Sequence, residues 1–151
     1  MPQTSFLAES LRIEGILRPP TDAEKAAFRD FLLLRDVTLA DICSLQAVFA
    51  PECPLRTKPG MNVRVGAHLP PPGGEQIPKR LERLLAMTDP FEQHVAFETL
   101  HPFMDGNGRT GRALWAWRMF QSGRDPFALS FLHRWYYQTL GNLQTLGNLG
   151  K

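Results

Sequence analysis

The stretch from residue 51 to residue 74 most constrains what this chain can fold into, because prolines and glycines interrupt it repeatedly. Proline has no amide hydrogen to donate and clashes with the preceding helical turn, so no helix can cross this stretch. Inside it Met61, Val63 and Val65 alternate with other residues, a pattern typical of a strand. We therefore expect a small β-hairpin flap over 60–74. An isolated hairpin is only marginally stable in water, so the flap must lie against helices or pair with a strand of a partner.

Helical patterns flank the flap on both sides. Thr21 and Glu24 have the spacing of a capping box, and Asp89-Pro90 places an N-cap residue before a proline suited to the first helical turn. We expect Asn107 to cap the helix that follows it. The expected helices cover residues 5–14, 21–35 and 38–50, a segment from Pro78, then 89–100 and 107–123, and a last segment that opens at Asp125-Pro126 and carries Phe127, Phe131, Trp135 and Leu140.

These patterns and the composition define the class of protein. The chain has 151 residues, of which 43% are hydrophobic and 21% charged, so it is long and apolar enough to bury a core. We expect a single all-α domain over 1–151, a compact helical bundle with the flap. A net charge of +2 is too small to indicate nucleic acid. With no apolar run of about 18 residues, no secretory signal and only two cysteines, we expect a cytoplasmic protein that does not bind a membrane.

The segment HPFMDGNGRTGR at 101–112 is rich in glycine and lies between two expected helices. Its glycines have the spacing of a dinucleotide-binding loop, but that fold needs a strand before the loop. They also have P-loop spacing, but Arg112 and Ala113 replace the lysine and the hydroxyl residue that P-loops require. Asp105 and Asn107 begin like a calcium loop, but no glutamate closes it. None of these three motifs is therefore present.

The same segment has the properties of an anion-binding site. Gly106 and Gly108 let the backbone approach a ligand, and the amide groups at the start of the next helix point at negative charge. Arg109 and Arg112 are three residues apart and share one face of that helix. Two cations at a helix N-terminus oppose the helix dipole, which indicates a site for a polyphosphate.

Two further residues of the segment indicate a reaction. Asp105 can hold a metal ion that bridges phosphates, most naturally Mg²⁺. His101 can accept a proton near neutral pH. Together with the anion site, these groups predict group transfer from a nucleotide.

The segment resembles the signature of the Fic family, H-x-F-x-D/E-G-N-G-R-x-x-R. Every fixed position matches: His101, Phe103, Asp105, Gly106, Asn107, Gly108, Arg109 and Arg112. The resemblance covers most of the chain and makes 89–123 the catalytic helix–loop–helix. Val63, Arg64, Val65 and Gly66, followed by the prolines at 70–72, are similar to the family's target-docking flap.

The resemblance implies transfer of AMP from ATP to a hydroxyl side chain of an unidentified target protein. His101 would deprotonate the hydroxyl and Asp105 would hold Mg²⁺. The other motif residues would bind ATP: Asn107 and the backbone at Gly106 and Gly108 the transferring phosphate, Arg109 the β-phosphate and Arg112 the γ-phosphate, while Phe103 packs beneath the loop and fixes it.

Residues 10–15, SLRIEG, resemble the inhibitory motif of the family, S/T-x-x-x-E-G/N, and make 1–17 an inhibitory helix. Ser10 and Glu14 lie on one helix face. In this interpretation Glu14 pairs with Arg112 and takes the place of the γ-phosphate. The alternative is that Glu14 is a solvated acid at a helix end.

Three alternative functions stay open. Some relatives, such as Doc, act as kinases, but those have a lysine where this chain has Gly108, which favours AMP transfer. Glu14 could instead position a water that removes AMP from the target. A non-catalytic nucleotide-binding module is the third, and the intact His101 and Asp105 count against it. We expect His68, His94 and His133 to be structural or solvent-facing. The sequence does not identify the target or its modified residue, nor whether the chain forms a homo-oligomer.

Overall fold

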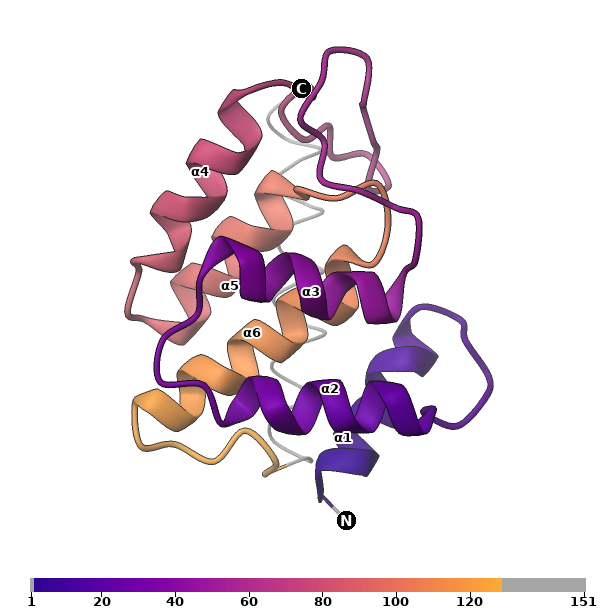
Figure 1. Cartoon of the computed structure of the whole chain (residues 1–151), viewed down its shortest axis with the longest axis vertical. Helices are drawn as coiled ribbons and strands as arrows, with labels where there is room; N and C mark the ends of the chain where they lie inside the picture. The colour runs from indigo at the N-terminus through magenta and orange to yellow at the C-terminus, as the bar shows by residue number, and fades with distance from the viewer. Residues whose placement is uncertain (1, 129–151) are drawn as a thin grey trace.

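The computed structural model describes residues 2–128, which form six helices and no strand (Figure 1). The predicted all-α class is therefore confirmed. The helices are α1 Pro2–Ile13, α2 Asp22–Leu32, α3 Leu39–Phe49, α4 Gln76–Leu85, α5 Pro90–Leu100 and α6 Asn107–Gln121. The expected helix from Asp125 falls mainly outside the described residues.

Helix α6 lies at the centre of the bundle and contacts α1, α2, α3 and α5 (Figure 1). Most of its side chains are buried, polar as well as apolar ones. A helix that is buried on all sides belongs to the interior of a fold. The central position of α6 matters for function because its first turns carry the arginines of the glycine-rich segment.

Helix α1 is attached to the bundle by apolar side chains. Phe6 stacks on Phe28 of α2 at 5.6 Å between ring centroids and on Trp115 of α6 at 6.3 Å. Leu7 and Leu11, on the same face of α1, are 3% and 1% exposed. Burying a leucine or phenylalanine side chain stabilises a fold by about 1.5–3 kcal/mol. The N-terminal helix is therefore a part of the core.

The expected helix starts are confirmed at three caps. Thr21 and Thr38 form complete capping boxes with Glu24 and Asp41. Asp89 accepts hydrogen bonds from the amides of the next helix. Helix α1 begins earlier than expected, at Pro2, and α2 ends earlier, at Leu32.

The hairpin expected over 60–74 is wrong. A single bridge joins Val65 and His68, whose backbones exchange two hydrogen bonds of 3.0 and 2.8 Å. Gly66, at φ 57°, makes the tight turn between them. The ladder goes no further because the prolines at 70–72 supply no amide hydrogens. The segment is a loop with one tight turn.

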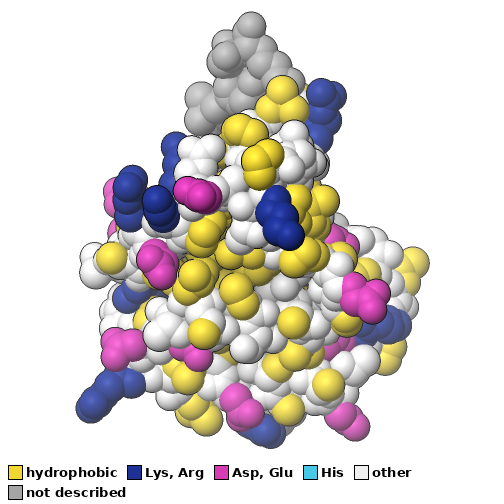
Figure 2. Space-filling model, turned by 45° about the horizontal axis from the view of Figure 1, so that its top comes forward, with side chains coloured by type: hydrophobic (Ala, Val, Ile, Leu, Met, Phe, Trp, Pro, Cys, Tyr) yellow, Lys and Arg dark blue, Asp and Glu magenta, His cyan; other side chains and the backbone are white. Residues whose placement is uncertain are grey.

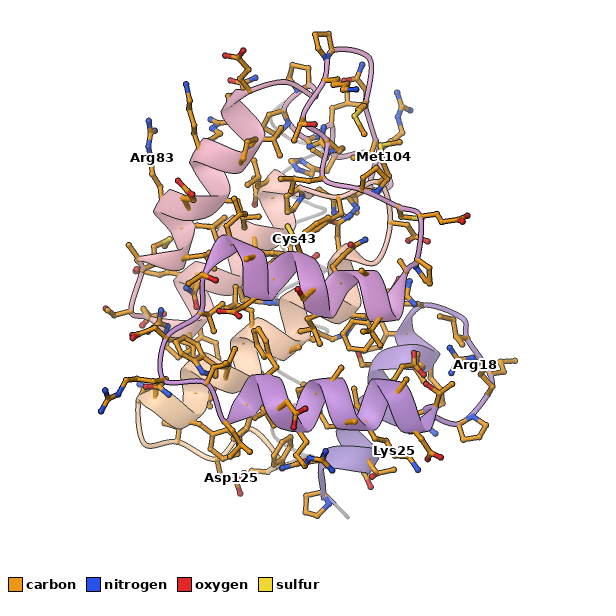
Figure 3. The ribbon with its side chains drawn as sticks, in the orientation of Figure 1. Arg18, Lys25, Cys43, Arg83, Met104 and Asp125 are labelled. Carbon is orange, nitrogen blue, oxygen red and sulfur yellow. The ribbon has the colours of Figure 1, made fainter. Side chains whose placement is uncertain are left out.

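The outer surface is mixed in character. Charged side chains of both signs lie around apolar ones on the face that Figure 2 shows. Arg18, Arg83 and Asp125 lie at the periphery of the bundle in Figure 3, whereas Cys43 on α3 is half-buried against the core. Within residues 2–128, no helix has the length and apolar character needed to cross a membrane.

Candidate active site

The glycine-rich segment joins the C-terminus of α5 to the N-terminus of α6. Helix α5 ends at Leu100, and His101 follows in the left-handed conformation, at φ 49° and ψ 64°. Gly106, at φ 79°, stands at the N-cap position of α6. The left-handed region costs a residue with a side chain about 1–2 kcal/mol, so other contacts must hold His101 there.

Asn107 does not cap α6, contrary to expectation. Its Oδ1 accepts from the amide of Phe103 at 2.8 Å, and its Nδ2 donates to the Phe103 carbonyl at 2.8 Å. Both residues are 1% exposed. The Asn107 side chain therefore closes the loop on itself and leaves Gly106 as the residue at the cap.

Gln46 of α3 holds the other side of the loop, a role that the sequence does not predict. Its Nε2 donates to the carbonyl of Asp105 at 2.9 Å and to that of Cys53 at 2.6 Å. Gln46 is 3% exposed. The backbone beside Asp105 is therefore fixed from α3 as well as from α6.

His101 is half-buried and its Nδ1 has no hydrogen-bond partner among the described residues. Burial is the main reason that the pKa of His101 falls to about 4, and the positive charge of Arg56 lowers it further. His101 is therefore neutral at pH 7. A neutral imidazole with an unpartnered nitrogen can accept a proton.

Asp105 directs its carboxylate outward, and its side chain is 68% exposed. One oxygen, Oδ1, accepts from the amide of Gly106 at 2.7 Å and lies 3.8 Å from Nη2 of Arg109. The described residues hold no cluster of three or more metal-ligating His, Cys, Asp or Glu. A lone exposed carboxylate suits Mg²⁺, which usually binds through one or two carboxylates together with substrate phosphates.

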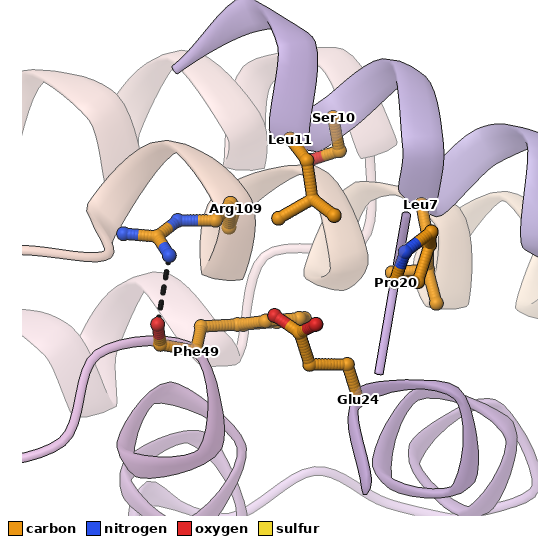
Figure 4. Close-up of a pocket in the computed structure, with 7 residues that line it drawn as sticks. All are labelled: Leu7, Ser10, Leu11, Pro20, Glu24, Phe49 and Arg109. Atoms are coloured by element: carbon orange, nitrogen blue, oxygen red, sulfur yellow. Dashed lines mark hydrogen bonds between the residues drawn. The ribbon is translucent and has the colours of Figure 1, made fainter. Parts of the chain in front are cut away.

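Arg109 lies between Asp105 of the loop and the end of α3. Its Nη1 donates to the carbonyl of Phe49 at 2.7 Å, at the C-terminus of α3, where the helix dipole attracts a cation (Figure 4). The interior space beside it is too narrow for a water molecule. The residues around this space come from α1, α2, α3, α6 and the α1–α2 connection: Leu7, Ser10, Leu11, Pro20, Glu24, Phe49 and Arg109.

Arg112 points to α1, and the predicted pairing with Glu14 is present. Nη2 of Arg112 lies 2.6 Å from Oε1 of Glu14 and donates to the carbonyl of Ser10 at 2.9 Å. Its Nε donates to the hydroxyl of Ser10 at 2.6 Å. Arg112 is 4% exposed, so α1 binds most of its guanidinium away from solvent.

The carboxylate of Glu14 also lies against the first turn of α6. A Cβ added at Gly108 would overlap Oε1 of Glu14 and lie 3.0 Å from Nη1 of Arg112. Amides at a helix N-terminus attract anions. The carboxylate of Glu14 therefore lies beside the N-terminal turn of α6.

Two buried titratable side chains lie beneath α6. Burial raises the pKa of Glu98 to about 8, and it lowers the pKa of His94 to about 4. Nδ1 of His94 lies 3.1 Å from the carbonyl of Gly111. The interpretation of His94 as structural is supported, since it is 2% exposed. No motif in the sequence indicates the role of Glu98.

Comparison with known proteins agrees with the motif. A model of the Fic/DOC family matches residues 36–118, which is more than half of the chain. No curated protein is similar enough to the chain to count as a match.

Proposed function

Because the chain belongs to the Fic/DOC family, we propose that this Fic-type enzyme transfers AMP from ATP to a hydroxyl side chain of another protein. The observation that carries this proposal is the meeting of three features at one loop. These are the neutral His101, the exposed carboxylate of Asp105 and the N-terminus of α6. They supply a base, a metal ligand and an anion site.

In the proposed reaction the target hydroxyl gives its proton to His101 as its oxygen attacks the α-phosphorus of ATP. A new P–O bond forms, the bond between the α-phosphorus and the bridging oxygen breaks, and pyrophosphate leaves. Asp105 would hold Mg²⁺, which neutralises charge on the phosphates. Asn107 and the backbone amides at Gly106 and Gly108 would bind the transferring phosphate, and residues 63–66 are our candidate for contact with the target.

We further propose that Glu14 inhibits this reaction. Its carboxylate places a negative charge at the anion site and engages the guanidinium of Arg112 at 2.6 Å. While this contact persists, Arg112 cannot bind the γ-phosphate, and the α-phosphorus is not aligned with the hydroxyl. Loss of Glu14 should therefore increase transfer.

The proposal is tested by incubating the protein with cell lysate, Mg²⁺ and either α-³²P-ATP or γ-³²P-ATP. We expect protein to be labelled from the α-position only, and more strongly with Glu14→Ala than with wild type. Glu9→Ala is the matched control, because Glu9 lies on α1, which ends at Ile13 just before Glu14, and pairs with the exposed Arg12 at 2.7 Å. In the Glu14→Ala background, His101→Ala should lower labelling by roughly 10²–10⁴-fold.

Different results identify the alternatives. Label from the γ-position alone would mean phosphate transfer. Equal labelling by wild type and Glu14→Ala at saturating ATP would refute inhibition. No label with any variant would leave a nucleotide-binding module and refute transfer.

A further inference from the structure

Arg56 is a fully buried arginine that no motif in the sequence distinguishes. It is 0% exposed, and no carboxylate in residues 2–128 forms an ion pair with it. Burying a cation without a carboxylate is costly unless other groups satisfy its hydrogen bonds. Backbone carbonyls satisfy the guanidinium of Arg56 instead.

The guanidinium of Arg56 binds two parts of the chain at once. Nε donates to the carbonyl of His101 at 2.8 Å and Nη2 to that of Leu100 at 2.9 Å. Nη1 donates to the carbonyls of Met61 at 3.1 Å and Pro71 at 2.8 Å, one from each limb of the 60–74 loop. Arg56 therefore ties that loop to the end of α5.

The backbone around Arg56 adds to this connection. Its amide donates to the carbonyl of Pro102 at 2.9 Å, and its carbonyl accepts from Gly74 at 3.0 Å. The amide of Met104 donates to the carbonyl of Pro54 at 3.0 Å. The glycine-rich loop thus lies along residues 54–56, near Met104 in Figure 3.

We propose that Arg56 is a positioning residue that holds the backbone of His101 in its left-handed conformation and so aims the imidazole at the target hydroxyl. This inference rests on the proposed role of His101 as the base. Leu100 and His101 end α5, where helix carbonyls lack partners within the helix. A planar guanidinium can bind two such carbonyls along one edge, whereas a lysine ammonium cannot reproduce that fork.

The charge of Arg56 has a second effect on His101. A nearby cation opposes protonation of the imidazole, and Arg56 is the largest charged contributor to the lowered pKa of His101. His68 acts in the same direction, whereas Glu14 and the carbonyl of Glu98 act in the opposite one. Arg56 therefore helps to keep the base in its neutral form.

Two variants separate the bidentate hydrogen bonding of Arg56 from its positive charge. Arg56→Lys keeps the charge and loses the bidentate geometry, and Arg56→Met loses both. Arg118→Met is the matched control, because Arg118 also donates to a backbone carbonyl, that of Leu85 at 3.0 Å, but lies on α6 away from His101. All three are made in the Glu14→Ala background.

The first measurement is the pKa of His101 by NMR titration of the imidazole, with unfolding followed in urea as a check of folding. Wild type should titrate well below pH 6.5. Relative to the Glu14→Ala protein, Arg56→Met should move the pKa of His101 upward, Arg56→Lys should move it less, and Arg118→Met should leave it unchanged. If Arg56→Met does not fold, the pKa of His101 in Arg56→Lys and in wild type still tests the electrostatic effect of Arg56. A wild-type pKa at or above 6.5, or an unchanged pKa in a folded Arg56→Met, would overturn the electrostatic part.

The second measurement is AMP transfer against pH. Arg56→Lys should lower kcat at least roughly tenfold with KM for ATP changed less than about twofold, because a small misplacement of a reacting group has large effects. The acid limb of the pH profile should move upward in Arg56→Met. Unchanged kcat in Arg56→Lys would refute the positioning role. The NMR result does not depend on activity, so a shifted pKa without any AMP transfer would refute the proposed function and leave the electrostatic effect of Arg56 standing.

Discussion

Substituting alanine for Gly108 and for Gly111 should have different effects on stability, although both glycines lie within α6. Glycine inside a helix is less stable than alanine by about 0.5–1 kcal/mol, so helix propensity favours both substitutions. The surroundings differ. A Cβ at Gly111 would overlap Oε1 of Glu98 and lie 2.8 Å from Cδ1 of Phe97. A Cβ at Gly108 meets only the ends of the Glu14 and Arg112 side chains.

The structure gives the magnitude of each effect. Phe97 and Glu98 are 0% and 8% exposed, so neither can move aside freely. Overpacking a core in this way costs about 1–3 kcal/mol, which exceeds the gain in propensity. Next to Gly108 the Glu14 side chain is 34% exposed and can swing into solvent, which sacrifices an ion pair worth about 1 kcal/mol. Gly108→Ala should therefore be nearly neutral, and Gly111→Ala should be destabilising by roughly 1–2 kcal/mol.

The assay is equilibrium unfolding in urea, followed by circular dichroism, for the two variants and wild type. The control is Gly108→Ala combined with Glu14→Ala. With the carboxylate gone, the same alanine should stabilise the Glu14→Ala protein by up to about 1 kcal/mol. If Gly111→Ala were as stable as Gly108→Ala, the close contact between α5 and α6 at Glu98 would be refuted.

Three further predictions concern stability. Burial raises the pKa of Glu98 to about 8 from an unfolded value near 4.5. The contribution of Glu98 to stability is therefore complete below pH 4.5 and is lost as the pH rises to 8. Glu98→Gln should flatten this decline in the free energy of unfolding, measured by urea titrations at several pH values. Thr21→Ala should lower the free energy of unfolding by about 1 kcal/mol through loss of the cap, with Ser5→Ala on the exposed side of α1 as the control in the same urea assay. Phe6→Ala should cost about 3–5 kcal/mol, read as a lower thermal midpoint, because its ring stacks on two others.

Local signals in the sequence were sufficient for the starts of α2, α3 and α5, but not for those of α1 and α6. The capping boxes at Thr21 and Thr38 and the Asp89-Pro90 pair depend on residues three positions apart or fewer, and all are present. The spacing of Ser10 and Glu14 likewise placed both on one face of the chain toward Arg112. These features need no knowledge of the rest of the fold.

Two features could not be predicted from the sequence: the absence of a hairpin at 60–74, and the two side chains that hold the glycine-rich loop in place. Alternation at 61–65 indicates an extended backbone but does not show whether a second segment supplies donors, and the prolines at 70–72 do not. Arg56 and Gln46 act on backbone carbonyls. Every residue has such a carbonyl, so no residue type marks the partner in the sequence.

The anchoring of α1 limits how the molecule can be activated. The region that matches the family model begins at residue 36, yet the side chains of Phe6, Leu7 and Leu11 fill space against α2 and α6. Deleting the N-terminal helix would expose the apolar surface that these side chains cover, and the protein would be less stable. Under the proposed inhibition by Glu14, an activating ligand or partner therefore has to displace the Glu14 side chain from Arg112 while α1, which ends at Ile13 just before Glu14, stays in place.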